Sequence, residues 1–203
     1  MYRAIRILCV MMLLSACFAF AQTEFSADVI QSNKTADHGT KVYCGKDKMR
    51  FEGVGDARSG GSGAVIFDLN KDTWTVLMDK QHMYMEMPSK MMENRGMFHF
   101  FKTGDVENAC AEWQALDANK GGTCRKVGDE TVNGRNAVKY EGTNSEGKRS
   151  TVWLDSRIRF PLKWEDKDGG GELQNIKEGP QPSSLFTVPS DYKKFDMSGM
   201  QHQ

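Results

Sequence analysis

The 203-residue sequence has no excess of charge of either sign, since its 27 Lys and Arg residues balance its 27 Asp and Glu residues. No segment gathers the basic residues into the stripe that nucleic acid or an anionic membrane surface would attract. Long apolar runs are also missing, because no stretch after residue 21 approaches the roughly 20 apolar residues that a membrane-spanning helix needs. We therefore expect neither nucleic-acid binding nor a transmembrane segment in the chain beyond residue 21.

Histidine is scarce, and the motifs of common catalytic and cofactor sites are missing. His38, His82, His99 and His202 are the only histidines, and none lies in a nucleophile elbow or a Cys/His arrangement. There is no Cys-x-x-Cys pair or His-Glu-x-x-His run to bind zinc, and the glycine-rich stretches, which we interpret as turns, lack the ending of a phosphate-binding loop. The sequence predicts a non-enzymatic protein with no catalytic residues, no metal and no cofactor.

The first 21 residues have the features of a secretory signal. Arg3 and Arg6 precede an apolar run at residues 7–14, and Ala19-Phe20-Ala21 forms an Ala-x-Ala cleavage site. We expect residues 1–21 to be removed on export to the periplasm of the cell envelope. The remaining chain has 25 basic and 27 acidic residues, so it is close to neutral.

Residues 14–17, Leu-Ser-Ala-Cys, also resemble a lipobox in which Cys17 would be lipidated. The Ala-x-Ala site and the bulky Phe18 favour the soluble product, with anchoring at Cys17 as the alternative. The chain beyond residue 21 has a length that suits one core. We expect a single domain over residues 22–192 and a disordered tail over residues 193–203.

Three cysteines lie beyond the signal. Cys110 and Cys124 bracket a short polar loop, and export to an oxidising compartment predicts a disulfide between them, with two thiols as the alternative. Cys44 lies in a strand-like run, where a small buried residue is expected rather than a reactive thiol.

Apolar and polar residues alternate along most of the chain, with turn residues between the alternating segments, as in antiparallel sheets. We predict a mainly β protein with strands at residues 25–31, 40–51, 64–69, 73–78, 82–87, 125–132, 137–143, 148–155, 161–166 and 172–177. Two helices are expected at 88–101 and 108–116, with a Gly/Ser-rich loop at 58–63.

Methionine is abundant, and seven of the thirteen lie between residues 78 and 97. Met83, Met85 and Met87 have the two-residue spacing that puts side chains on one face of a strand. This row could be ordinary core packing, or an apolar wall that adapts to ligands such as acyl chains. Spacing alone favours core packing.

The third interpretation of the row is a soft-metal site. Thioethers and imidazole suit Cu(I), and His82, with Met83, Met85 and Met87, would be its ligands. A second candidate cluster comprises Met197, Met200 and His202. Alternate strand residues are about 6.5 to 7 Å apart, too far for neighbouring thioethers to bind one ion without further ligands.

Several segments together resemble an uncharacterised exported bacterial family related to the outer-membrane lipoprotein-sorting carriers, the LolA-like proteins. The resemblance covers most of the mature chain, and its motifs consist of strand and turn residues. They are Lys41-Val42-Tyr43, Lys48-Met49-Arg50-Phe51-Glu52, Met83-Tyr84-Met85-Glu86-Met87-Pro88, residues 127–135, Val138-Lys139-Tyr140, Trp153-Leu154-Asp155, Phe160-Pro161-Leu162-Lys163 and Leu185-Phe186-Thr187-Val188-Pro189.

The resemblance implies an α+β, mainly β fold: a curved antiparallel sheet that forms an incomplete β-barrel, covered by one or two helices with an apolar cavity between. It implies a lipid or a lipoprotein acyl chain as ligand. We therefore expect a periplasmic protein that binds a hydrophobic ligand through Met83, Met85, Met87, Met91, Phe98 and Phe101. The alternative is a structural or sensory envelope module that contacts another protein, and copper binding is third.

Overall fold

The computed structural model describes residues 23–32, 40–53, 63–88, 103–115 and 119–195. The expected signal peptide, the helix expected after Pro88 and the loop at 58–62 lie outside these ranges. Met91, Phe98 and Phe101 of the expected ligand site lie outside them as well. The described residues contain twelve strands, which are β1 (Phe25–Gln31), β2 (Thr40–Cys44), β3 (Lys48–Glu52), β4 (Gly63–Asp68), β5 (Thr73–Met78), β6 (Met83–Pro88), β7 (Thr123–Val132), β8 (Arg135–Thr143), β9 (Arg149–Asp155), β10 (Pro161–Asp166), β11 (Gly169–Glu178) and β12 (Lys193–Lys194).

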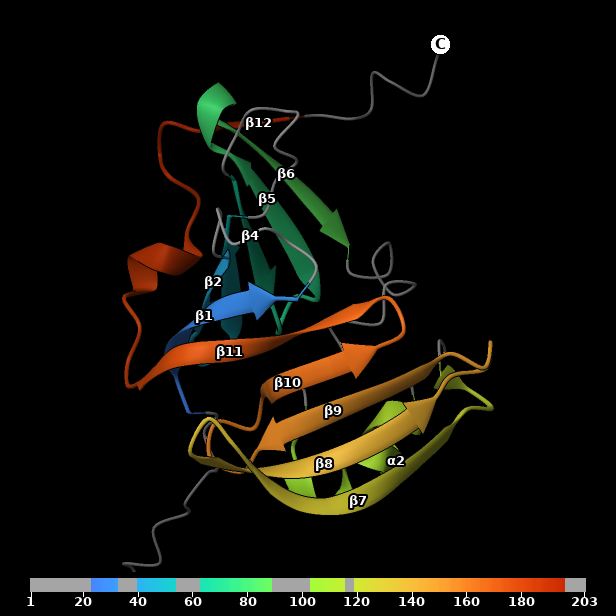
Figure 1. Cartoon of the computed structure of the whole chain (residues 1–203). Helices are drawn as coiled ribbons and strands as arrows, with labels where there is room; N and C mark the ends of the chain where they lie inside the picture. The colour runs from blue at the N-terminus through green and yellow to red at the C-terminus, as the bar shows by residue number, and fades with distance from the viewer. Residues whose placement is uncertain (1–22, 33–39, 54–62, 89–102, 116–118, 196–203) are drawn as a thin grey trace, which may run out of the picture.

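All twelve strands belong to one sheet, with the order β12-β6-β5-β4-β3-β2-β1-β11-β10-β9-β8-β7. Every neighbouring pair is antiparallel except β12 and β6, which are parallel. Most neighbours are consecutive in the chain, as the hairpin pattern predicted. The sheet is strongly twisted, so β4, β5 and β6 cross β8 and β9 at a large angle (Figure 1). β7 and β12 end the sheet, so it is open rather than a closed barrel, and the predicted mainly β class is confirmed.

The strand predicted at residues 40–51 is two strands, β2 and β3, joined by a tight turn. The N–H of Gly45 donates to the carbonyl oxygen of Lys48 at 2.8 Å and closes the turn. Gly45 also lies against the ring of Phe186, since a Cβ atom there would be 3.0 Å from a ring carbon. Val42 and Cys44 are even-numbered whereas Met49 and Phe51 are odd-numbered, so the alternation changes phase at this turn.

The sequence predicted a turn at the glycine run 169–171. In the structure these glycines are part of β11. Gly170 and Gly171 pair with Glu165 and Trp164 of β10. A Cβ atom on Gly171 would lie 2.4 Å from Cζ2 of Trp164, so the missing side chain leaves the space that the indole fills. Gly171 is therefore explained by packing, and the turn lies at residues 167–168, before the glycine run.

One α-helix, α2 (Ala109–Gln114), lies among the described residues and confirms the prediction of a short helix at 108–116. It follows the 3-10 turn η7 (Val106–Asn108), in which the Asp105 side chain accepts a hydrogen bond from the N–H of Glu107. Trp113 and Ala109 are its buried residues. α2 lies against one face of β7 and β8 (Figure 1). No helix in the described ranges combines the length and the apolar character needed to cross a bilayer.

Residues 193–195, which fall in the predicted tail, are among the described residues. After the 3-10 turn η9 (Ser183–Phe186), the chain reaches β6, where Lys193 donates its N–H to His82 and Phe195 donates to Tyr84. These two bonds make β12. The sequence did not predict this strand because the segment is polar. Its pairing depends on β6, which lies more than a hundred residues earlier in the chain.

Among the residues that the structure describes, the buried apolar side chains form three clusters. The central cluster includes Phe25, Val42, Met49, Trp74 and Leu173, all at most 2% exposed. The α2 cluster includes Val106, Ala109, Val138, Tyr140, Val152 and Leu154. The C-terminal cluster joins Ala64, Ile66 and Leu77 to Tyr84, Val188 and Tyr192.

Candidate ligand-binding face

The methionine row of β6 lies on one face of the sheet, as its spacing predicted. Met83, Met85 and Met87 are half-buried, and they pair with Met78, Val76 and Trp74 of β5. The same face continues through Val65 of β4 to Phe51 of β3, because successive strands are in register. We call the half-buried set the methionine face: Phe51, Val65, Val76, Met78, Met83, Met85 and Met87.

The methionine face grades into the buried core at one end. Met87, Phe51 and Val65 pack against the central cluster. In that cluster, the rings of Phe67 and Trp74 are 4.6 Å apart. Met87 therefore packs against the buried aromatic residues of the central cluster, whereas Met83 and Met85 lie further along the strand from them.

The opposite face of the same strands is covered by the C-terminal segment. Tyr84, which alternates with the methionines, packs on Ala64, Ile66 and Leu77 together with Val188 and Tyr192. The hydroxyl of Tyr192 donates to Asp79 at 2.8 Å and ties this cover to the β5–β6 turn. Because its far side is closed in this way, the half-buried apolar surface of β4–β6 lies on the methionine face.

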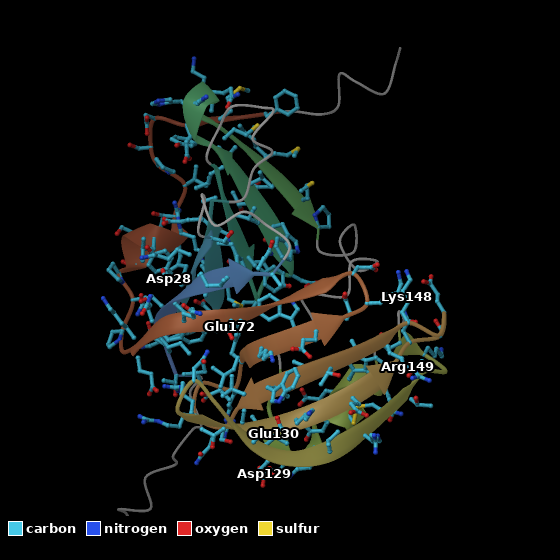
Figure 2. The ribbon with its side chains drawn as sticks, in the orientation of Figure 1. Asp28, Asp129, Glu130, Lys148, Arg149 and Glu172 are labelled. Atoms are coloured by element: carbon cyan, nitrogen blue, oxygen red, sulfur yellow. A yellow bond between two sulfur atoms is a disulfide. The ribbon has the colours of Figure 1, made fainter. Side chains whose placement is uncertain are left out.

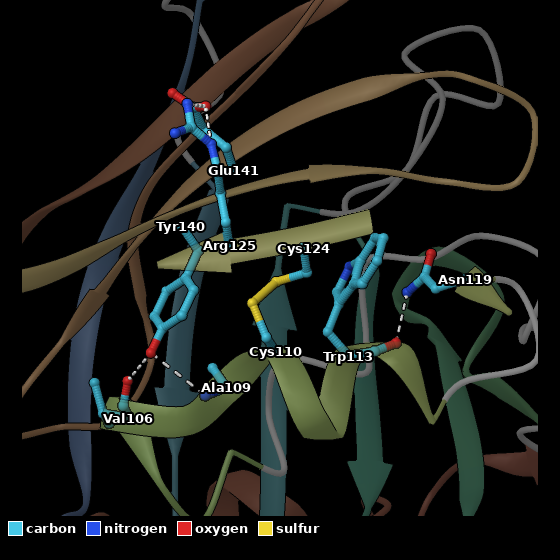
Figure 3. The surroundings of a disulfide bond; sticks show 9 residues. All are labelled: Val106, Ala109, Cys110, Trp113, Asn119, Cys124, Arg125, Tyr140 and Glu141. Carbon is cyan, nitrogen blue, oxygen red and sulfur yellow. Dashed lines mark hydrogen bonds and ion pairs between the residues drawn. A yellow bond between two sulfur atoms is a disulfide. The ribbon is translucent and has the colours of Figure 1, made fainter. Parts of the chain in front are cut away.

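The α2 end of the sheet has a disulfide at its centre. Cys110 of α2 is bonded to Cys124 of β7, which confirms the predicted pairing (Figure 3). The Tyr140 hydroxyl donates to the carbonyl oxygen of Val106 at 2.7 Å and accepts from the N–H of Ala109 at 3.4 Å. Burial of the Tyr140 phenol raises its pKa. Three separate links thus fix η7 and α2 against the sheet.

A small pocket opens between α2 and the sheet. Its volume is only about 10 Å³, which is room for a water molecule, and it is lined by Ala109, Trp113, Cys124, Tyr140, Gly142, Ser150 and Val152. Gly142 makes room for Trp113, because a Cβ atom there would be 3.2 Å from the indole. Trp164 packs against both the α2 cluster and the central cluster, so the two apolar regions adjoin at its side chain.

On the outer face of β8–β10, charged side chains surround a buried tryptophan, Trp153. The Trp153 ring lies between the ammonium groups of Lys139 and Lys163, which are 4.9 and 4.7 Å from its centroid. Its indole N–H donates to Glu130 at 2.7 Å, and this bond, with that from Lys139, lowers the pKa of Glu130. The side chains of Lys139 and Lys163 cover the Trp153 ring, so no apolar surface is exposed at this residue.

Cys44 is buried in the central cluster, as the sequence predicted. Its Sγ–H donates to the carbonyl oxygen of Gly45 at 3.7 Å. Desolvation by burial raises the pKa of the Cys44 thiol to about 12, with a further contribution from the charge of Glu24. Since the thiolate is the nucleophile, this residue is structural and not reactive.

His82 does not point along the methionine row as a metal site on one strand face would require. It lies in the turn before β6 with a left-handed backbone (φ 50°), and its Nδ1 is 2.6 Å from a carboxylate oxygen of Asp191. Its ring also packs on Tyr192, with centroids 5.5 Å apart. The described residues contain no group of three or more His, Cys, Asp or Glu side chains that could hold a metal ion.

Sequence reasoning identified three residues of the methionine face and missed four. Phe51, Val65, Val76 and Met78 come from strands that were predicted correctly or nearly so, but the sequence did not show which strands pair. The signal that could have found them is the alternation of residues 73–78, which places Val76 and Met78 on one face.

The chain is similar in structure to several proteins of known structure, at low sequence identity. An uncharacterized conserved protein from Thermus thermophilus is 12% identical with a TM-score of 0.53, covering 86% of this chain and 90% of that one. A LolA superfamily protein from Nitrosomonas europaea is 12% identical with a TM-score of 0.34, covering 82% and 90%. The Pseudomonas aeruginosa MucA/MucB complex matches at 13% identity and a TM-score of 0.38, covering 84% of this chain and 57% of that chain.

The match to the Thermus thermophilus protein shows a common fold, and at 12% identity it carries no information on activity. No protein-family model matches the sequence, and no curated protein matches it.

Proposed function

We propose that this protein is a non-enzymatic, exported binder of a hydrophobic ligand, a lipid or an acyl chain, and that the ligand contacts the methionine face. The observation that carries the proposal is the row of seven half-buried apolar side chains that runs across four neighbouring strands, from Phe51 to Met83. The resemblance to the lipoprotein-sorting carriers favours the same kind of ligand. The contribution of Met91, Phe98 and Phe101 stays a prediction.

The chemistry of the methionine face suits a flexible apolar chain. Methionine side chains are unbranched and polarizable, so they adapt to ligands of varying shape. Each methylene group of a ligand that leaves water contributes about 0.8 kcal/mol, so a chain of a few carbons gains useful affinity without polar recognition. The methionine face has no charged side chain among its members, as this mode of binding requires.

Export of the mature chain is part of the proposal. The Cys110–Cys124 disulfide supports it, because disulfides persist in oxidising compartments such as the periplasm. Mass spectrometry of the mature N-terminus tests it: a chain that starts at Gln22 is expected, and a lipidated Cys17 would instead show a membrane-anchored form.

Native mass spectrometry of protein purified from the cell envelope tests the ligand. We expect bound lipid, and we expect a fluorescent fatty acid to bind the delipidated protein. Met85→Gln, which keeps the side-chain length but adds an amide to the methionine face, should weaken fatty-acid binding several-fold. Glu86→Gln is the matched control, since Glu86 is the next residue, faces the other way and pairs with Lys194.

Two results would contradict the proposal. If no lipid co-purifies and the fluorescent fatty acid does not bind, the alternative of an envelope module that contacts another protein is favoured. If Met85→Gln and Glu86→Gln bind the fatty acid as the unmodified protein does, the ligand site lies elsewhere. Titration with Cu(I) in the same preparations tests the third hypothesis, which requires at least micromolar affinity.

A further inference from the structure

β7 is the last strand of the sheet and presents one long edge. It pairs with β8 along one side over its ten residues, and no described strand pairs with its other side (Figure 1). The unpaired N–H and C=O groups of such an edge can pair with another chain. The identity of that chain can be argued from the side chains of β7.

The charges of β7 are divided between its two halves. Arg125 and Lys126 precede Val127, whereas Asp129 and Glu130 follow Gly128. The side chains of Arg125 and Asp129 are 71% and 76% exposed. Val127, at the centre, is one of two exposed large apolar residues among the described ones. Figure 2 shows Asp129 and Glu130 at the outer rim of the sheet.

A β-bulge determines which face each charge occupies. The register with β8 shifts between Lys126 and Gly128, so Arg125 lies opposite Glu141 and Gly128 lies opposite Lys139. Arg125 and Glu130 therefore lie on the same face, on which Glu130 binds Lys139 at 2.9 Å. Without the bulge, residues five apart would point to opposite faces.

Lys126 and Asp129 share the other face, where their charged groups are 3.5 Å apart. Each face of β7 thus carries one cation before the bulge and one anion after it. An antiparallel copy of the same strand presents the reverse order on each face. A parallel copy would place like charges opposite each other.

We infer that β7 pairs antiparallel with β7 of a second copy of this chain, about a two-fold axis at Val127 and Gly128. Arg125 of each copy then lies opposite Glu130 of the other on one face, and Lys126 lies opposite Asp129 on the other face. The two Val127 side chains meet near the axis. Such an interface is isologous, the commonest arrangement in soluble homodimers, and it turns the exposed edge into an interior strand of a continuous sheet.

Sedimentation equilibrium of the mature protein, combined with a charge swap, tests this inference. Lys126→Glu and Asp129→Lys each place like charges across the axis and should weaken the dimer about tenfold or more. An equimolar mixture of the two variants should regain the dimer, because Glu at position 126 then faces Lys at position 129. Raising the salt concentration should weaken the unmodified dimer, since exposed charges are screened.

Lys148→Glu is the matched control, because it makes the same change of charge in the β8–β9 turn, away from the axis at Val127 and Gly128, and should leave the dimer unaltered (Figure 2). Lys126 also contacts Glu107 and Arg125 also contacts Glu141, so Arg125→Glu serves as a second variant with a different partner within the chain, and circular dichroism checks that each variant is folded. A protein that stays monomeric up to about 1 mM overturns the inference. So do folded variants that dimerise like the unmodified protein, or a mixture that does not regain the dimer.

Discussion

The indole of Trp164 occupies the space that a side chain on Gly171 would fill, since a Cβ atom there would lie 2.4 Å from Cζ2 of Trp164. Trp164 in turn packs against both the central cluster and the α2 cluster. This pair of residues therefore joins the two halves of the apolar core, across β10 and β11.

Gly171→Ala should destabilise the protein, because the new methyl group would collide with Trp164 and with the carbonyl oxygen of Ile30 at 2.8 Å. Overpacking of this kind costs about 1–3 kcal/mol in the free energy of unfolding, which urea denaturation measures. Gly104→Ala is the control, since its Cβ would meet its nearest neighbour, Glu112, at 3.4 Å. Adding Trp164→Leu to Gly171→Ala should cost less than the sum of the two changes, and strict additivity would contradict the contact.

Removal of the disulfide should lower the stability without changing the fold. The bond closes a loop of sequence separation 14. A loop of this length contributes about 3 kcal/mol by restricting the unfolded chain. We expect Cys110→Ser with Cys124→Ser to show this loss in urea, and the unmodified protein in reductant to match it. A double variant as stable as the oxidised protein would show that the link between α2 and β7 contributes nothing.

Arg135 should be important for stability because of the carboxylate that it pairs with. Its guanidinium binds Asp155, whose side chain is 2% exposed, and also Glu178. Hydrogen bonding to Asp155 raises the pKa of Arg135, although its partial burial opposes this. Arg135→Met would leave Asp155 buried without its cation, at a cost of about 3 kcal/mol in the free energy of unfolding.

Arg157 provides the comparison for Arg135. It also binds Glu178, but its side chain is 78% exposed. Arg157→Met should therefore change the free energy of unfolding by less than about 1 kcal/mol. Equal losses from the two variants would show that burial of Asp155 does not set the cost.

Asp68 should make part of the stability depend on pH. Desolvation by burial raises the pKa of this carboxyl, but hydrogen bonds from Lys71 and Asn70 and the charge of Lys48 outweigh it and lower the pKa below 3.8. A lowered pKa in the folded state adds stability above the unfolded pKa, and this contribution is lost as the pH falls through the folded pKa. Asp68→Asn should therefore be less stable than the unmodified protein near neutral pH.

The difference between Asp68→Asn and the unmodified protein should shrink as the pH falls from the unfolded pKa of about 3.8 towards the lower folded pKa, below which the carboxyl is protonated in both states. Urea denaturation at neutral pH and at pH 3 measures it. A difference that stays the same at both pH values would contradict the assigned pKa shift.

Local patterns were sufficient for most of the strands. Residues 73–76 alternate between threonine and apolar residues, and β5 has the predicted bounds. Where the prediction was wrong, a distant residue decided the outcome. The turn at Gly45 packs against Phe186, and Gly171 lies in a strand where its lack of a side chain leaves room for Trp164.

The candidate site divides in the same way. That Met83, Met85 and Met87 share one face follows from the period of a strand, and the Cys110–Cys124 bond follows from the cysteine count once export is expected. Their neighbours do not follow, because the partner of a strand is chosen by contacts between segments far apart in the chain. Register placed Met85 beside Val76 and Val65, and the C-terminal segment covered one face of β4–β6 but not the other. Spacing within a strand is a local property of the backbone, whereas burial depends on what packs against it.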